Sequence, residues 1–166
     1  MRQEEGAIWG ELTDAERAAR RAVVDLIAEG TTPDAEALAG ALACSPLEAR
    51  RLLAGLTTKG CLVRDGTEGG IVAAYPLSLR PTRHRVTLAG RTSVYALCGV
   101  DALGISPLFG LPAMIEARCP HCERPIRLRV EEGEVRERDP PGAALWYSLA
   151  DLLERPIAGL NLSAEH

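Results

Sequence analysis

Two groups of cysteines carry the residue types that could do chemistry in this chain. Cys98 and Asp101 stand three residues apart, so a helix would place the thiol and the carboxylate on one face, within reach of each other. A thiol beside a carboxylate inside an apolar helix is costly unless the pair is used or hydrogen-bonded. The spacing therefore allows a proton-transfer site, and equally a small buried cysteine beside an aspartate that caps a neighbouring loop.

The second group is the sequence Cys119-Pro120-His121-Cys122, in which C-x-x-C spacing lets two sulfurs bind one metal ion. Structural zinc usually requires four such ligands, and the sequence contains no second C-x-x-C or histidine pair. A complete zinc site would need Cys98, His84 or a carboxylate to converge on the turn. The alternative is a structural turn or a degenerate zinc knuckle. No cofactor is required, but Hg, Zn or Cu could bind through the thiolates of Cys98, Cys119 and Cys122.

The elements that must position these residues begin with three helices. Thr13 and Glu16 have the spacing of a capping box, which predicts a helix that ends at Gly30. Two further helices are predicted to start at Thr32-Pro33 and at Ser45-Pro46, each with a proline in the first turn. Two short strands around a glycine-rich turn follow, over 61–75. Three helices and a hairpin predict a winged helix-turn-helix-like domain over residues 1–76.

Residues 77–166 are predicted to form a second, mixed domain. A buried helix is expected over Thr92–Leu103, because its apolar positions cover most faces. Alternating apolar residues predict antiparallel strands over 83–88, 114–118 and 125–130, another from residue 135, and a last one over 144–147 before a short helix over 148–154. The fold class is therefore α+β: a winged-helix-like segment followed by a small mixed core with a catalytic-type helix.

Composition and charge narrow the range of partners. The net charge is −4, and residues 13–60 contain six basic and seven acidic side chains, whereas DNA-binding winged helices normally carry a basic recognition helix. Nucleic acid is therefore disfavoured as a partner. The sequence contains no run of 18 apolar residues, so no membrane span is predicted. We expect a cytoplasmic protein whose five cysteines are thiols or metal ligands rather than disulfides.

The stretch from Tyr95 to Leu103, followed by Pro107-Leu108-Phe109-Gly110, resembles the catalytic helix of the organomercurial (alkylmercury) lyases. In that family a tyrosine, the first catalytic cysteine and an aspartate stand at the spacing of Tyr95, Cys98 and Asp101. The segment around Cys119-Pro120 and Pro125-Ile126 is similar to the family's cysteine-containing strand and turn. The likeness covers residues 13–147, and its specific part lies at 95–125.

The resemblance implies protonolysis of a carbon–mercury bond. Cys98 as thiolate would bind the organomercurial, and Asp101 would pass the thiol proton to the leaving carbon. The family supplies a second catalytic cysteine about 60 residues after the first, but in this sequence no cysteine follows Cys122. Either Cys119 or Cys122 takes that place, or the chain binds the metal without cleaving the bond.

Three hypotheses follow, from different classes. The first is an alkylmercury-lyase-like enzyme with Cys98 and Asp101 as catalytic residues and an organomercurial as substrate. The second is a thiol metal-binding protein of the same fold, with Hg, Cu or Zn as its ligand. The third is a metal-responsive winged-helix regulator of transcription. The charge count disfavours the third and favours a winged helix used for packing or for homodimer formation.

Overall fold

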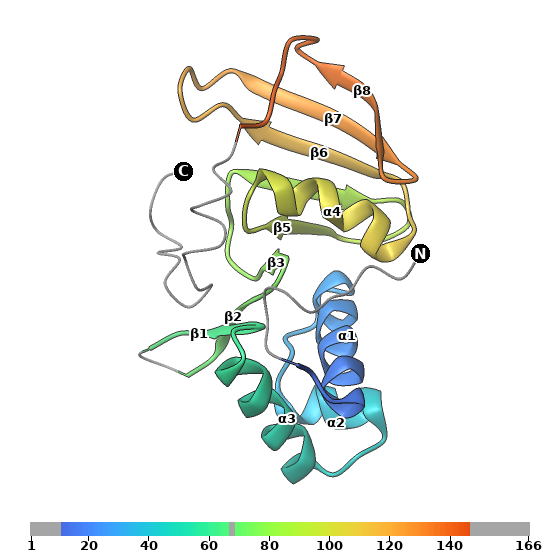
Figure 1. Ribbon diagram of the computed structural model, residues 1–166, viewed down its shortest axis with the longest axis vertical. Coiled ribbons are helices and arrows are strands. Elements are labelled where there is room, and N and C mark those ends of the chain that lie inside the picture. The colour runs from blue at the N-terminus through green and yellow to red at the C-terminus, as the bar shows by residue number, and fades with distance from the viewer. Residues whose placement is uncertain (1–10, 67–68, 147–166) are drawn as a thin grey trace.

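The computed structural model describes residues 11–66 and 69–146, and these residues form an α+β fold (Figure 1). Eight strands make one antiparallel sheet in the order β1-β2-β3-β5-β4-β6-β7-β8. Their bounds are β1 Leu62–Arg64, β2 Ile71–Ala74, β3 Leu77–Ser78, β4 His84–Leu88, β5 Ser93–Ala96, β6 Ala113–Arg118, β7 Pro125–Glu131 and β8 Glu134–Asp139. The helices are α1 Asp14–Ala28, α2 Ala35–Leu42, α3 Pro46–Thr58 and α4 Gly99–Phe109. The predicted α+β class, with helices and antiparallel strands, is confirmed.

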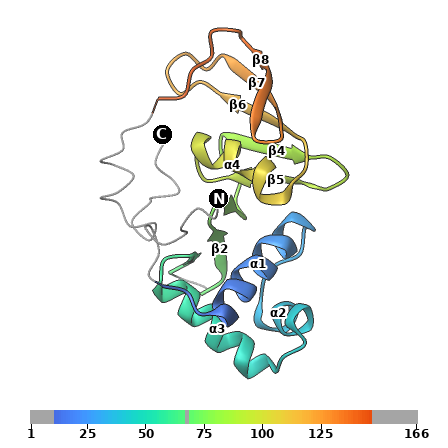
Figure 2. The same cartoon turned by 45° about the vertical axis from the view of Figure 1, so that its right-hand side comes forward.

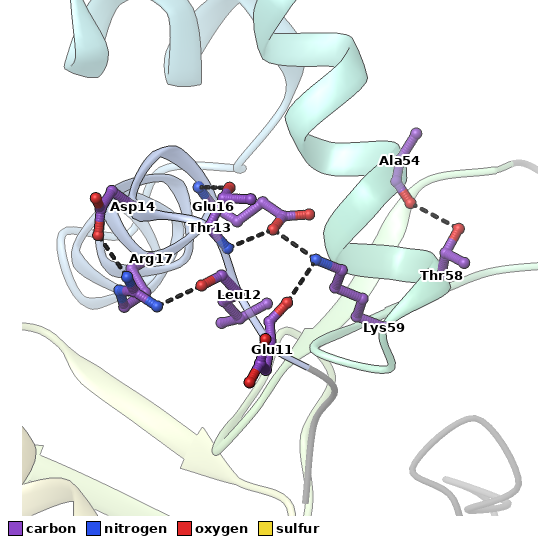
Figure 3. Close-up of polar contacts among 9 residues, drawn as sticks. All are labelled: Glu11, Leu12, Thr13, Asp14, Glu16, Arg17, Ala54, Thr58 and Lys59. Carbon is purple, nitrogen blue, oxygen red and sulfur yellow. Dashed lines mark hydrogen bonds and ion pairs between the residues drawn. The ribbon is translucent and has the colours of Figure 1, made fainter. Parts of the chain in front are cut away.

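The first three helices begin where their capping residues predict, with one exception. Thr13 and Glu16 form the expected reciprocal capping box at α1 (Figure 3). Ser45 caps α3, with its hydroxyl accepting from the Glu48 N–H at 3.2 Å. The prediction for α2 was wrong by two residues: its N-cap is Asp34, not Thr32. The Asp34 carboxylate accepts from two backbone N–H groups, of Glu36 and Ala37, and a carboxylate can satisfy both donors at once.

Glu16 also joins α1 to α3. Its carboxylate lies 2.6 Å from the Lys59 ammonium at the end of α3, and Lys59 donates to the Glu11 carbonyl as well (Figure 3). The hydrogen bond from Lys59, followed by that from the Thr13 N–H, lowers the pKa of Glu16 from its ordinary 4.5 to about 2. One side chain thus caps a helix and ties it to its neighbour.

Acidification is expected to weaken the Glu16–Lys59 ion pair between α1 and α3. A carboxyl whose pKa is lower in the folded state stabilises the fold above its unfolded pKa, and the contribution is lost as pH falls from 4.5 through about 2. The variant Glu16→Gln should therefore have a flatter dependence of Tm on pH across that interval, measured by circular dichroism. Glu36→Gln, at an exposed position of α2, is the matched control. An unchanged slope in Glu16→Gln would show that the ion pair contributes nothing.

The helical segment docks against α4 and the β4–β5 turn. In both views α1 lies below α4 (Figures 1 and 2), and the Arg21 guanidinium of α1 donates to the Leu108 carbonyl at 3.1 Å. The guanidinium groups of Arg21 and Arg91 lie 5.6 and 5.1 Å from the centre of the Phe109 ring, which is cation–π distance. The Thr92 hydroxyl donates to the Ala28 carbonyl at 2.8 Å. These contacts fix α1 relative to α4.

The hydrophobic core and the sheet both continue across residue 76. Buried side chains of α1, α2 and α3 belong to the same cluster as Leu77, Val86 and Ile105. Strand β2 pairs with β3, and β3 pairs with β5 through Leu77 and Ala96. The predicted boundary between 1–76 and 77–166 therefore falls in the turn between two paired strands.

The predicted helix over Thr92–Leu103 was wrong in its first half. Residues 93–96 are strand β5, and the helix α4 begins only at Gly99. Val94 and Ala96 are buried while Ser93 and Tyr95 are half-buried, which is the alternation expected of a strand. This strand pairs with β3 on one side and with β4 on the other. The other strands predicted up to residue 139 are confirmed, but residues 144–146 form no strand, and residue 147 and the helix predicted over 148–154 lie outside the described residues.

Among the residues described, no helix is long and apolar enough to span a bilayer.

Candidate active site

Cys98 occupies the junction between the last residues of β5 and the first turn of α4. Its backbone is extended, with φ −150° and ψ 179°, so it is the N-cap of the helix rather than a residue within it. Its sulfur accepts a hydrogen bond from the Asp101 N–H at 3.4 Å, as the oxygen of a serine N-cap would. Cys98 and Asp101 meet as predicted, but through helix capping and not through a shared helix face.

The Asp101 carboxylate is the buried acid of the site. Its residue is 5% exposed, and it accepts side-chain hydrogen bonds from the Cys98 thiol and from the Tyr75 hydroxyl. Burial raises the pKa of Asp101, while the hydrogen bonds from Cys98 and Tyr75 oppose that rise. A carboxylate with two proton donors directed at it can accept a proton from either of them.

The two donors respond to the same surroundings. Burial, followed by the charge of Asp101 and the hydrogen bond to it, raises the pKa of the Cys98 thiol to about 12. The same causes raise the pKa of Tyr75 well above its ordinary value. At neutral pH Cys98 is therefore a thiol, and the Asp101 carboxylate is the neighbouring group that can take its proton.

Tyr75 is a site residue that the sequence did not reveal. It follows β2 directly, and the Leu97 N–H donates to the Pro76 carbonyl at 3.1 Å, which holds this turn beside the start of α4. Tyr75 and Asp101 lie 26 residues apart in a chain without an obvious motif around Tyr75, so only the pairing of β3 with β5 brings them together.

A mainly apolar cavity of about 670 Å³ lies beside the site and is lined in part by α4. Its lining includes Gly99, Ala102 and Leu103 from α4, along with His84, Leu128 and Leu145. Burial, together with the neighbouring Arg83, lowers the pKa of His84, so its imidazole is neutral at physiological pH. Gly99 borders the cavity, whereas Cys98 and Asp101 do not line it. The cavity offers an apolar volume one residue away from the thiol.

Cys119 and Cys122 lie in the turn between β6 and β7. No group of three or more His, Cys, Asp and Glu side chains in the parts of the chain that the structure describes is arranged to hold a metal ion. Cys98 is therefore not gathered with Cys119 and Cys122 into one three-sulfur site, and their role as metal ligands stays a prediction. Of the remaining cysteines, Cys61 is 1% exposed and belongs to the core, and Cys44 is half-buried.

Comparison with known proteins finds a likeness to alkylmercury lyases in sequence and a likeness in fold to one solved structure. The family model for alkylmercury lyase matches residues 77–155. An alkylmercury lyase of Bacillus cereus is 36% identical over 78 residues, which are 47% of this chain and 35% of that protein. One of Streptomyces lividans is 27% identical over 125 residues, 75% of this chain and 55% of that protein. The chain thus spans between a third and about half of the length of these relatives.

Among solved structures, the crystal structure of the mercury-bound form of MerB2 has the same fold, with a TM-score of 0.73 at 23% identity over 90% of this chain and 71% of that chain. The segment that matches the family model contains Cys98, Asp101 and the Cys119–Cys122 turn. Over residues 77–155 this chain is therefore similar in sequence to the alkylmercury lyases.

Proposed function

We propose that this protein cleaves carbon–mercury bonds of organomercurials by protonolysis, with Cys98 and Asp101 as its catalytic residues. The observation that carries the proposal is the contact between Cys98 and the buried Asp101, whose N–H donates to the Cys98 sulfur at 3.4 Å and whose carboxylate interacts with the thiol. Mercury is a soft metal that binds thiolate more strongly than any other side chain, and the neighbouring carboxylate is the group that can generate the thiolate.

The first step exchanges a ligand on mercury. The Cys98 proton moves to Asp101, the sulfur forms a bond to mercury, and the ligand opposite the organic group leaves as an anion. The high pKa of Cys98 keeps the thiol protonated until then, so that the proton needed later is already in the site. The apolar cavity next to Gly99 is a suitable place for the organic group.

The second step breaks the carbon–mercury bond. The proton on Asp101 moves to carbon, the bonding electron pair goes with carbon to form the hydrocarbon, and mercury(II) stays on the Cys98 sulfur. Burial raises the pKa of Asp101 and so favours its protonated form, which suits it to deliver the proton. A second thiolate must complete the coordination of mercury, and a thiol added in solution supplies it in the experiment below.

The N-terminal part has a separate role in this proposal. Helices α1, α2 and α3 followed by the β1–β2 pair have the element order of a winged helix. The contacts of Arg21 and Thr92 support its use as a packing module for α4. A non-catalytic metal-binding protein is the second candidate function, and it rests on the same thiol.

The direct test is product formation. The purified, reduced chain is incubated with phenylmercury and excess thiol, and benzene is measured by gas chromatography. We expect benzene to accumulate over several turnovers, because the thiol removes mercury(II) from Cys98 after each cycle. Mercury bound without any benzene would exclude the lyase and leave the metal-binding protein.

Tyr75 is expected to act as a positioning residue for Asp101. The variant Tyr75→Phe removes the hydroxyl whose hydrogen bond opposes the rise in the pKa of Asp101, so that pKa should rise further. Because the first step needs the ionised carboxylate, the acid limb of the profile of kcat/KM against pH should move to higher pH. The measurement is the rate of benzene release across the pH range.

Tyr95→Phe is the matched control, because Tyr95 alternates with the buried Val94 and Ala96 and so lies on the other face of β5. Its pH profile should coincide with that of the unaltered chain. A Tyr75→Phe profile that also coincides would exclude the positioning role.

A further inference from the structure

The turn between β6 and β7 holds its two cysteines in a fixed geometry. The Cys119 N–H donates to the Arg124 carbonyl at 3.0 Å, and the Glu123 N–H donates back to the Cys119 carbonyl at 2.9 Å. Glu123 closes the turn in the left-handed region, with φ 55°. The β6–β7 ladder begins directly outside it, at Arg118 and Pro125. The loop is therefore anchored at both ends by backbone hydrogen bonds.

The two sulfurs lie next to each other in this turn. The backbone N–H groups of Cys122 and His121 and the Cys122 thiol are close enough to the Cys119 sulfur to act on it. These donors lower the pKa of Cys119, as expected where N–H groups face a sulfur. Cys122 itself is exposed, so the pair is open to solvent.

The side chains around the turn are mainly basic, and they already form an ion pair and a hydrogen bond with Glu123. The Glu123 carboxylate forms an ion pair with Arg83 at 2.7 Å, and the Arg118 guanidinium donates to the Glu123 carbonyl at 3.3 Å. The one acidic side chain of the turn is thus held by arginine. In the described residues no third His, Cys, Asp or Glu joins the two sulfurs.

A pair of sulfurs without further ligands favours a metal ion that is stable with only two ligands. Zinc prefers four ligands in a tetrahedral arrangement and is therefore poorly served by this turn. Mercury(II) binds two thiolates in a linear arrangement, and it is the soft ion that the proposed reaction releases. The turn also lies at the same end of the sheet as the start of α4, because His84 pairs with Ala117 and lines the same cavity as Gly99 (Figure 1).

We propose that Cys119 and Cys122 form a second mercury(II) site, distinct from Cys98, that takes up the metal ion released by carbon–mercury cleavage. The choice of metal rests on the proposed function, whereas the dithiol geometry does not. Binding forms two sulfur–mercury bonds and releases the two thiol protons to water, without any change of oxidation state.

The test uses the whole chain with Cys98→Ser, so that the catalytic thiol cannot contribute. The reduced protein is dialysed against mercury(II) chloride with excess glutathione, and retained mercury is measured by atomic absorption. Since both sulfurs lie on one turn, they should hold mercury against a monothiol, and adding Cys122→Ser should lower the affinity by roughly 10²-fold. Adding Cys44→Ser instead is the matched control and should leave retention unchanged.

X-ray absorption at the mercury edge should show two sulfur neighbours in the Cys98→Ser chain. Equal retention with and without Cys122, or a coordination shell with a single protein sulfur, would overturn the second site. Circular dichroism of each variant checks that the fold is intact. Benzene release by the unaltered chain is measured in parallel, so failure of the metal site and failure of the lyase proposal give different results.

Discussion

Replacing Cys98 by alanine is expected to abolish benzene release from phenylmercury. The thiol is the only sulfur hydrogen-bonded to Asp101 among the residues that the structure describes, so its loss removes both the mercury ligand and the proton that the carboxylate passes on. The measurement is the initial rate of benzene formation under excess thiol. Because Cys98 also caps α4, thermal unfolding must show that the variant remains folded.

The matched control is Cys44→Ala, which removes a half-buried thiol far along the chain from the site. It should retain the full rate. Serine at position 98 separates the two roles of the cysteine, since a serine caps a helix well but binds mercury poorly. A Cys98→Ser variant that is stable and inactive supports the proposal, whereas benzene release at the normal rate from Cys98→Ala would refute it.

Asp101→Asn is expected to lower the rate of benzene release by roughly 10²- to 10⁴-fold, the usual contribution of a positioned acid or base. Asparagine has nearly the same shape and can still meet the Tyr75 hydroxyl, but its amide cannot take the proton of Cys98 or deliver it to carbon. Mercury should still bind to Cys98. The two quantities to measure are kcat for benzene and the amount of mercury bound per chain.

The Asp101 variant distinguishes proton transfer from packing. Asp101 is buried, so an uncompensated loss of hydrogen bonds would lower stability, and unfolding in urea reports that loss separately. A folded Asp101→Asn chain that releases benzene at the normal rate would mean that solvent supplies the proton. The carboxylate would then serve only to hold Tyr75 and Cys98.

Much of the secondary structure could be predicted because its signals are local. The Thr13–Glu16 capping box, the proline after Ser45 and the alternation in β7 each act within a few residues, and each has its predicted outcome. The error at residues 92–103 has a local cause as well. An apolar run of this length is compatible with either a buried strand or a buried helix. Its first half forms a strand because it pairs with β3 and β4.

The sequence by itself determined the α+β class, the nearness of Cys98 to Asp101 and the dithiol turn, since all three depend on residues a few positions apart. Only the tertiary structure decided that Tyr75 joins Asp101, that Cys98 is a helix cap, and that an apolar cavity adjoins Gly99. These features depend on which strands pair and on where α4 packs. That outcome follows from burying the whole set of apolar side chains in one core, so no short stretch of sequence contains it.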